Sequence, residues 1–279
     1  MKNAEFRPKL NPADKPFEFP SKSGRSFMLK DCFKPQVTIA IGSFIQAALC
    51  AILPFRWAIV PSAAVLLNSI ITTLIQVRST KPSDHHTWPG NRTTSVLFRD
   101  IRLQARSEFC CGLPSRLSDK PPLGLAAPGM KEIGENFTAI LKDLESNRDE
   151  YGLLTSSSWR GDERNSNNTL LNIYYFRDME GLQRFAHGDI HRKVWDYMNK
   201  TKPKHIGIFH ETYSVPARAY ENIYVNCHPV LMGRASVRTT PAGEEDERWT
   251  NTLVSADVPA MKTQYARMSR DEQGSLKET

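Results

Sequence analysis

Imidazole and indole side chains gather in the second half of this sequence. His187, His191 and Trp195 follow one another at four-residue intervals, and His210 comes shortly after them. An imidazole titrates near neutral pH, so it can transfer protons, and it can also ligate a metal or haem iron. On one continuous helix, His187 and His191 would share a face. These residues are therefore candidates for acid–base or ligand chemistry, with core packing and helix capping as the structural alternatives.

The segment that carries the first two histidines is predicted to form two short helices. Asp178 is a suitable N-cap, whereas Gly188 costs about 1 kcal/mol in a helix interior. We therefore predict helices over 179–186 and 190–200, with a break between them. The break puts the two rings on different helices, and no HExxH pattern is present, so zinc hydrolase chemistry is not supported and no metal ligands are assigned.

Two strands are predicted downstream, HIGIFHETYSV and AYENIYVNCHPV. Alternation places His210 on one face of the first strand and Glu211 and Tyr213 on the other. In the second strand, Tyr224 shares a face with other hydrogen-bonding side chains. Such residues are ordinary at a sheet rim or a dimer interface. The functional hypothesis is that His210 and Tyr224 join the helix residues around an apolar cavity with a few polar groups, as in ligand pockets.

The elements upstream complete the expected fold. MKEIGENFTAILKDLESNRDEY has apolar residues at helical spacing, while LLTSSSWRG and TLLNIYYFRD flank a polar turn and predict a hairpin. SVLFRDIRLQARSEF is compatible with a strand or a short helix. The resulting order of strands and helices is close to a ferredoxin-like α+β sandwich.

A long apolar segment, residues 37–77, precedes this domain, and its only charge is Arg56. Crossing the hydrocarbon core takes about 20 apolar residues, and residues 37–55 and 57–77 each meet that length. We therefore predict an N-terminal membrane helix hairpin. One span with a re-entrant half is the main alternative, and a buried helix pair or a signal peptide fits less well.

The charges beside the apolar segment predict its orientation. Lys30 and Lys34 precede it, and Arg78 and Lys81 follow it, so the positive-inside rule places both ends in the cytosol. We expect a membrane protein, most naturally of the endoplasmic reticulum, with its catalytic domain facing the cytosol. The four N-x-S/T patterns of the chain would then stay unglycosylated.

Composition limits the remaining classes. The chain has 279 residues and a net charge of +7 without long basic runs, so a nucleic-acid groove is not indicated. Five cysteines without regular spacing indicate a reducing compartment. No dinucleotide-binding loop, P-loop or GxSxG elbow is present. Besides the hairpin, the predicted regions are an irregular segment over 1–36, a linker over 78–95, the main domain over 96–232, and a disordered polar tail over 233–279.

Several segments together resemble a known family. PLGLAAPGMKEIGENF, YGLLTSSSW, LLNIYYFRDMEGLQRFAHGDIHRKVWDYM and HIGIFHETYSVPARAYENIYVN, within 121–232, resemble a fungal secondary-metabolite monooxygenase family that includes the monooxygenase of the fumagillin pathway. The resemblance implies a dimeric α+β barrel of ferredoxin-like subunits that oxygenates a hydrophobic natural product. Relatives in the wider superfamily either need no cofactor or bind haem.

The resulting hypothesis is a membrane-anchored, homodimeric monooxygenase that acts with dioxygen on a hydrophobic polyketide or terpenoid. It needs no cofactor, because a histidine base activates the substrate; haem with an axial histidine is the alternative. A non-catalytic, membrane-tethered scaffold for a lipophilic intermediate is a further alternative. The catalytic candidates are His191, His210 and Glu211, and the substrate-binding candidates are His187, Trp195, Tyr213 and Tyr224.

Overall fold

The structure, a computed structural model, divides into two compact units. A helical unit comprises residues 22–85 and 119–127, and a mixed unit comprises residues 1–21, 86–118 and 128–279. The residues that the structure describes are 8–19, 35–78, 88, 91–96, 111–112, 129–160, 170–202, 208–216, 219–239 and 248–276.

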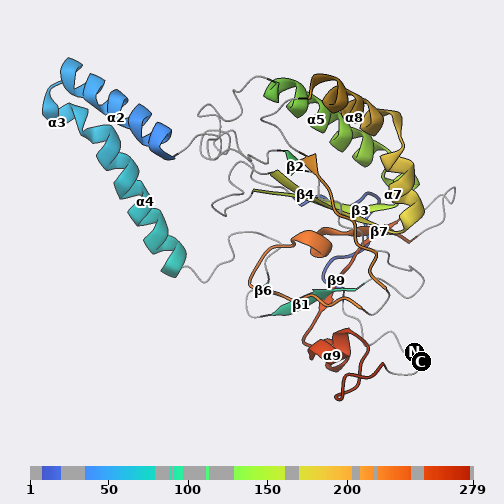
Figure 1. Cartoon of the computed structure of the whole chain (residues 1–279). Helices are drawn as coiled ribbons and strands as arrows, with labels where there is room; N and C mark the ends of the chain where they lie inside the picture. Colours follow the sequence, from blue (N-terminus) through green and yellow to red (C-terminus); the bar gives the residue numbers. More distant parts are fainter. Residues whose placement is uncertain are drawn as a thin grey trace. The chain divides into compact units, whose positions relative to one another are not determined.

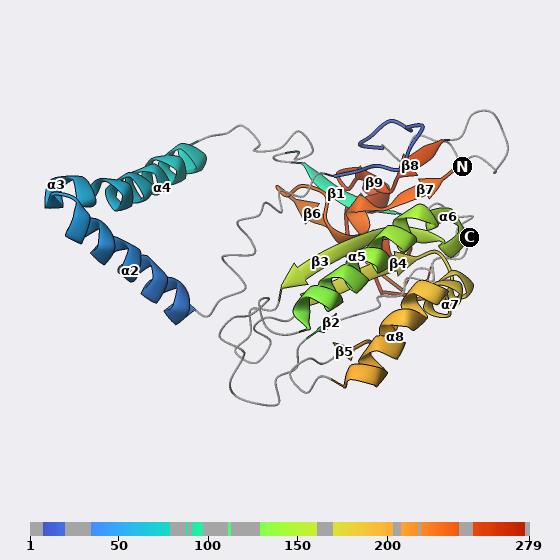
Figure 2. The same cartoon turned by 90° about the horizontal axis from the view of Figure 1, so that it is seen from above.

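The helical unit is an open V (Figures 1 and 2). Its helices are α2 (Pro35–Ile52), α3 (Phe55–Ala58) and α4 (Val60–Arg78). At the apex, the Gln46 side chain donates a hydrogen bond to the Ala58 carbonyl over 3.1 Å and accepts one from the Ser62 hydroxyl over 2.8 Å. Away from α3 the two long helices diverge, so most of their side chains do not pack on each other.

Large apolar side chains are exposed along both long helices. Phe44 and Ile52 are 77% and 79% exposed. One run among the described residues, Phe55–Ile75, is long and apolar enough to cross a bilayer. The apolar stretch of α2, Gln36–Ile52, is shorter than the roughly 20 residues that a span needs. The predicted hairpin of two membrane spans is therefore not confirmed, and one candidate span remains.

In the mixed unit, a helix, a hairpin and two further helices follow one another in the predicted order. The segment SVLFRDIRLQARSEF, predicted as a strand or a short helix, lies outside the described residues from residue 97 onward. The antiparallel strands β3 and β4 form the main hairpin, β2 pairs antiparallel with β5, and β2 also contacts β4. Helices α5, α7 and α8 lie on one side of these strands (Figure 1). The elements are β2 (Cys111–Gly112), α5 (Met130–Ser146), α6 (Arg148–Tyr151), β3 (Leu153–Arg160), β4 (Leu170–Phe176), α7 (Met179–Ala186), α8 (Asp189–Thr201) and β5 (Ile208–Phe209).

Side-chain alternation along β3 and β4 divides the core between two faces. Leu153, Tyr174 and Phe176 pack toward the helices, whereas Leu154 and Tyr175 pack against the opposite layer. The helices bury an amphipathic face against the sheet, which is the expected driving force for this layer. The helix-side cluster is completed by Ile140, Leu144, Tyr151, Leu182 and Phe185.

The segment AYENIYVNCHPV was predicted to be one more strand of this sheet, and that prediction is wrong for the residues described. Only Tyr224–Val225 form a strand, β6, and it pairs with β1 (Arg92–Ser95) in a second sheet of order β6-β1-β9. β1 itself lies in the segment predicted to be a linker, 78–95. Polar residues can build this strand because the hydroxyl groups of Thr94 and Ser95 find hydrogen-bond partners in neighbouring segments.

The C-terminal region is ordered where the structure describes it, which corrects the prediction of a disordered tail over 233–279. It forms η2 (Leu231–Arg234), β7 (Ser236–Arg238), β8 (Trp249–Asn251), β9 (Leu253–Ser255), η3 (Pro259–Met261) and α9 (Gln264–Arg267). Val254 and Ala256 are fully buried. Strands of three residues are too short to give a recognisable apolar alternation.

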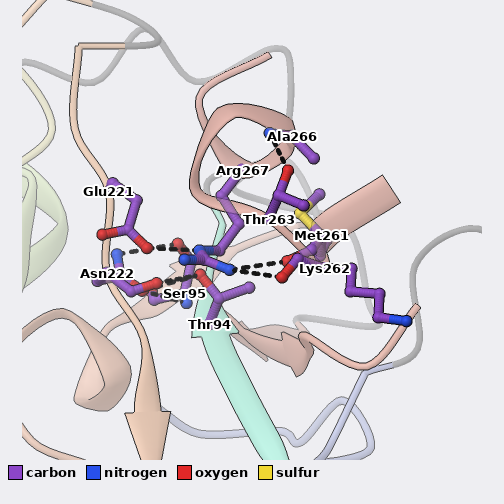
Figure 3. A network of polar contacts seen from close by, with 9 residues as sticks. All are labelled: Thr94, Ser95, Glu221, Asn222, Met261, Lys262, Thr263, Ala266 and Arg267. Carbon is purple, nitrogen blue, oxygen red and sulfur yellow. Dashed lines mark hydrogen bonds and ion pairs between the residues drawn. The ribbon is translucent and has the colours of Figure 1, made fainter. Parts of the chain in front are cut away.

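Described segments near both ends of the chain are tied to the second sheet and its neighbours. At the C-terminal end, Arg267 forms an ion pair with Glu221 and donates to the carbonyls of Met261 and Lys262 (Figure 3). At the N-terminal end, the Lys9 amide donates to the Leu253 carbonyl over 3.1 Å. Residues remote in sequence thus complete the layer opposite the helices.

Candidate functional site

The helix break that carries the histidines is formed as predicted. The Asp178 side chain caps α7 by accepting the Gly181 amide at 2.7 Å. Helix α7 ends at Ala186 and α8 begins at Asp189. Gly181 allows α7 to approach α6 closely, because a Cβ atom there would lie 2.0 Å from the Tyr151 carbonyl oxygen. The break and this close approach together determine the positions of the backbone atoms from which the side chains of α7 and α8 extend.

His191 lies at the junction of α7 and α8. Its Nδ1 atom is 2.9 Å from the Ala186 carbonyl oxygen, and its ring packs at 5.2 Å, centroid to centroid, from the ring of Phe185. A carbonyl can only accept, so Nδ1 carries the proton and the Nε2 lone pair of the neutral ring is left available. Nε2 has no hydrogen-bond partner among the residues that the structure describes.

The other imidazoles and the indole lie near this position. The His187 Nδ1 atom lies 2.9 Å from the Gln183 carbonyl, and this ring is exposed. The rings of Trp195 and His210 meet edge to face, with centroids 6.2 Å apart. The structure therefore brings His187, His191, Trp195 and His210 into one region, here called the imidazole cluster.

The environment lowers the pKa of His191 below its ordinary value of 6.5. Burial is the largest cause, and the positive charges that His210 and His187 can carry add to it, against the hydrogen bond to Ala186. His191 is therefore neutral over a wider pH range than an ordinary histidine. A neutral imidazole with a free Nε2 is suited to accept a proton.

Glu211 and Tyr213 form a separate exposed pair after β5. The Tyr213 hydroxyl donates to the Glu211 carboxylate, and this hydrogen bond is the main cause of the raised pKa of Tyr213. The predicted alternation does not apply to these residues, because β5 comprises only Ile208–Phe209. Glu211, a predicted catalytic residue, thus has its hydrogen bond with a phenol.

Tyr224 does not join the imidazole cluster. It is buried in β6, in the second sheet, which lies on the far side of β3 and β4 from α8 (Figure 1). Its hydroxyl oxygen accepts the Gly233 amide at 3.0 Å, and burial raises its pKa. A single cavity enclosed by His210, Tyr224 and the helix residues, as predicted, is therefore not formed by these side chains, because a sheet separates them.

The apolar side chains of α7 and α8 point to the core beside the cluster. Leu182 and Phe185 are buried, and Ile190 and Val194 pack against them. The imidazoles consequently lie at the rim of the helix–sheet core. Within the described ranges, no three residues of the types His, Cys, Asp and Glu come together in a way that could hold a metal ion.

Comparison with known proteins decides the family. The model of the family "monooxygenase af470-like" matches residues 120–232. Monooxygenase af470 of Aspergillus fumigatus is 37% identical to this chain over 96% of this chain and 98% of the relative. The chain belongs to the monooxygenase af470-like family. This confirms the resemblance found in the sequence and identifies the protein as an oxidoreductase of the monooxygenase type.

Solved structures resemble this family member only distantly. A crystal structure of aldoxime dehydratase aligns with a TM-score of 0.37 and 18% identity over 52% of this chain and 44% of that one. A conserved protein from Methanosarcina mazei aligns with a TM-score of 0.25 and 14% identity over 47% of this chain and 100% of its own. Scores at this level do not establish a common fold.

The family match contains all of the predicted site residues, since they lie between His187 and Tyr224. Sequence analysis missed two neighbours that define the state of His191, namely Phe185 and the carbonyl of Ala186. The contact with the Ala186 carbonyl could have been predicted from the helix end at 186. The last carbonyls of a helix lack intrahelical donors and can accept a hydrogen bond from a side chain.

Proposed function

We propose that this monooxygenase is held at a membrane and oxidises a hydrophobic polyketide or terpenoid intermediate of fungal secondary metabolism, with dioxygen as co-substrate. Family membership supports the reaction class. The exposed apolar run Phe55–Ile75 supports a membrane location, and such a location would bring the enzyme close to a lipophilic substrate.

The observation that carries the mechanism is the state of His191. Its Nδ1–H is engaged by the Ala186 carbonyl, its Nε2 is available, and its surroundings favour the neutral ring. We assign it as the general base that removes an acidic C–H proton of the substrate. Such a step is typically worth about 10²–10⁴-fold in rate.

In the cofactor-free form of this reaction, the substrate supplies every electron. The carbanion left after proton transfer to Nε2 reduces dioxygen, and an activated CH₂ group becomes a carbonyl. One oxygen atom enters the product and the other leaves as water. Trp195 and His210 are the proposed contacts for the apolar substrate beside the base, because they are the exposed rings adjoining His191. The pair Glu211–Tyr213 and the buried Tyr224 remain weaker candidates.

Oxygen consumption tests this assignment. The purified chain is incubated aerobically with an apolar β-diketone, which carries an acidic CH₂ group. We expect His191→Ala to lower the initial rate by about 10²–10⁴-fold. The matched control is His228→Ala, an exposed histidine outside the cluster, which should retain the rate. Equal rates for wild type and His191→Ala would remove His191 as the base.

Haem is the second candidate for the cofactor state, because the Nε2 atom of His191 has no hydrogen-bond partner among the described residues and would be able to hold the haem iron. Bound haem would supply redox chemistry at its iron. The absorption spectrum of the purified protein distinguishes the two forms: a Soret band that disappears in His191→Ala supports haem ligation, and its absence supports the cofactor-free reaction.

The location and assembly complete the proposal. We place the protein in the endoplasmic reticulum membrane as a homodimer, with a ferredoxin-like α+β-barrel domain facing the cytosol. The basic residues beside the apolar segment support this orientation. Treatment of the native protein with an endoglycosidase should leave its electrophoretic mobility unchanged. A mobility shift that is lost on replacing the sequon asparagines would reverse the orientation.

A further inference from the structure

The polar side chains of helix α4 differ in how their hydrogen bonds are satisfied. The Ser69 hydroxyl donates to the Val65 carbonyl over 2.9 Å, and the Thr73 hydroxyl donates to the Ser69 carbonyl over 2.8 Å. Ser62 is bonded to Gln46 of α2. These three hydroxyl groups are therefore satisfied within the helical unit.

Asn68 and Thr72 are two further polar residues of α4, and both are exposed. Neither side chain has a hydrogen-bond partner among the described residues. They are one turn apart, so they share a face, and Ala64 lies one turn before them on that face. Asn68 lies about 240° around the helix from Ser62, so it does not point toward α2.

Asn68 places a polar side-chain amide within the apolar run that could cross a bilayer. It lies near the middle of the apolar run Phe55–Ile75. If that run crosses a bilayer, the amide lies in hydrocarbon, where water cannot satisfy its donor and acceptor groups. Polar side chains in such positions associate helices by hydrogen bonding, and small residues let the backbones approach.

We propose that the Asn68–Thr72 face of α4 binds the same face of a second copy of this chain within the membrane. The argument for this occupant is chemical complementarity, since a carboxamide has both donor and acceptor groups and two related by a two-fold axis can satisfy each other. Thr72 adds a hydroxyl one turn away, and Ala64 leaves room for close packing. The inference rests on the membrane insertion proposed above.

Oxidative crosslinking in membranes tests this pairing. The full-length chain carries Val65→Cys, three residues from Asn68 on a neighbouring position of the face, in a Cys50→Ser background that removes the exposed native thiol of α2. We expect a disulfide-linked dimer that is absent without Val65→Cys. Adding Asn68→Leu should weaken association by about 3- to 30-fold, which corresponds to the usual strength of such interhelical hydrogen bonds.

Two further variants separate the amide from general effects on the helix. Asn68→Gln retains a carboxamide and should keep most of the crosslinked dimer. Ser69→Ala removes a hydroxyl that is bonded within its own helix, and it should leave the dimer fraction unchanged. An equal loss in Ser69→Ala and Asn68→Leu would contradict a specific amide contact.

Alkaline extraction of the same membranes distinguishes failure of this inference from failure of the anchor. If the chain stays in the membrane pellet and Asn68→Leu crosslinks as well as the parent, the pairing is overturned and the anchor stands. If the chain is released by alkali, both the anchor and the pairing are overturned. Neither result bears on His191 as the base, which the oxygen-consumption assay tests separately.

Discussion

At the scale of single residues, the clearest functional feature is the fixed tautomer of His191. The carbonyl of Ala186 accepts Nδ1–H, so the proton-accepting nitrogen is decided by the end of the preceding helix. Burial beside Phe185 then disfavours the charged ring. The residue types alone indicated a base among several histidines. His187 makes a similar hydrogen bond to Gln183 but is exposed, so partial burial is what distinguishes His191.

The neighbouring imidazoles should be visible in a titration. The pKa of His191, followed by NMR through its Cε1–H resonance, is expected below 6.5. In His210→Ala it should rise, because a nearby positive charge that lowers it has been removed. His228→Ala should leave it unchanged. A His191 pKa that stays constant in His210→Ala would contradict the electrostatic contact.

The sign of the pH dependence follows from the same shift. The rate should fall as the pH drops through the lowered pKa, because protonated His191 cannot accept a proton. The unfolded chain binds more protons than the folded chain between the folded and unfolded pKa values. The contribution of His191 to the free energy of unfolding is therefore complete above the unfolded pKa and decreases as the pH falls toward the folded one.

Tyr224 offers a residue-scale test of a structural assignment. Tyr224→Phe removes the acceptor of the Gly233 amide, which also donates to the Val230 carbonyl over 2.9 Å. Because that second acceptor remains, we expect a loss of only about 0.5–1.5 kcal/mol in the free energy of unfolding by urea. Tyr265→Phe, at an exposed position, should change it by less than about 0.5 kcal/mol. A large loss of oxygenase activity without loss of stability would instead favour a site at Tyr224.

At the scale of elements, the contact between α6 and α7 positions the imidazole cluster. Gly181→Ala would bring a Cβ within 2.0 Å of the Tyr151 carbonyl, so α7 must move. We expect a destabilisation of about 3 kcal/mol or more in urea unfolding. Since α7 also supplies the Ala186 carbonyl, the pKa of His191 should change in any variant that still folds.

Gly134→Ala is the matched control for this substitution. Gly134 lies inside α5, and a Cβ there meets nothing within 4 Å. Alanine has the higher helix propensity, so we expect a gain of about 0.5–1 kcal/mol. Similar losses for both glycine variants would contradict the close approach of α7 to α6.

The sequence predicted the elements with strong local patterns. Helix α5, the β3–β4 hairpin and the break between α7 and α8 depend on apolar periodicity, turn residues and an N-cap, all of which are local. The strand predicted over AYENIYVNCHPV failed because alternation does not determine which strand is the partner. The short strand β6 that this segment does form pairs with β1, which lies more than a hundred residues earlier in the chain.

At the scale of the whole molecule, the segments outside the family match stabilise those within it. Arg267 is 8% exposed and Glu221 is 21% exposed, so their ion pair is largely removed from water. The side-chain oxygen of the neighbouring Asn222 accepts a hydrogen bond from the Ser95 amide (Figure 3). This bond holds the end of β1 beside the segment that leads into β6. These contacts join α9, β1 and the segment before β6 within the layer that packs against β3 and β4 on the side opposite the helices.

Arg267→Ala should therefore destabilise the mixed unit. Removing the cation leaves a partly buried carboxylate, and the partial exposure of Glu221 reduces the penalty to about 2–4 kcal/mol in urea unfolding. The double variant Arg267→Ala/Glu221→Gln should recover part of the loss, because no uncompensated charge remains. Lys131→Ala, which breaks an exposed pair on α5, should have an effect below about 1 kcal/mol. Additive effects of Arg267→Ala and Glu221→Gln would contradict a direct interaction.

The order of this C-terminal region had no local sign in the sequence. Its strands β8 and β9 have three residues each. Polar residues such as Asn251 and Thr252 are buried there, and in the sequence alone such residues are typical of an exposed polar tail. The Thr252 hydroxyl donates to the Met232 carbonyl, and the Asn251 amide donates to the Ala235 carbonyl. Such satisfaction depends on long-range folding, which composition does not report.

The interruption after Ala186 has a consequence for how a reactant must arrive. An unbroken helix would tie that peptide oxygen to an amide four residues later, and the ring of His191 would be free to turn. Because the interruption frees the oxygen to hold one nitrogen, the other nitrogen presents its lone pair in a single direction. If His191 is the proposed base, a substrate has to bring its C–H group to that nitrogen along this line, and the end of a short helix would then set the stereochemistry of deprotonation.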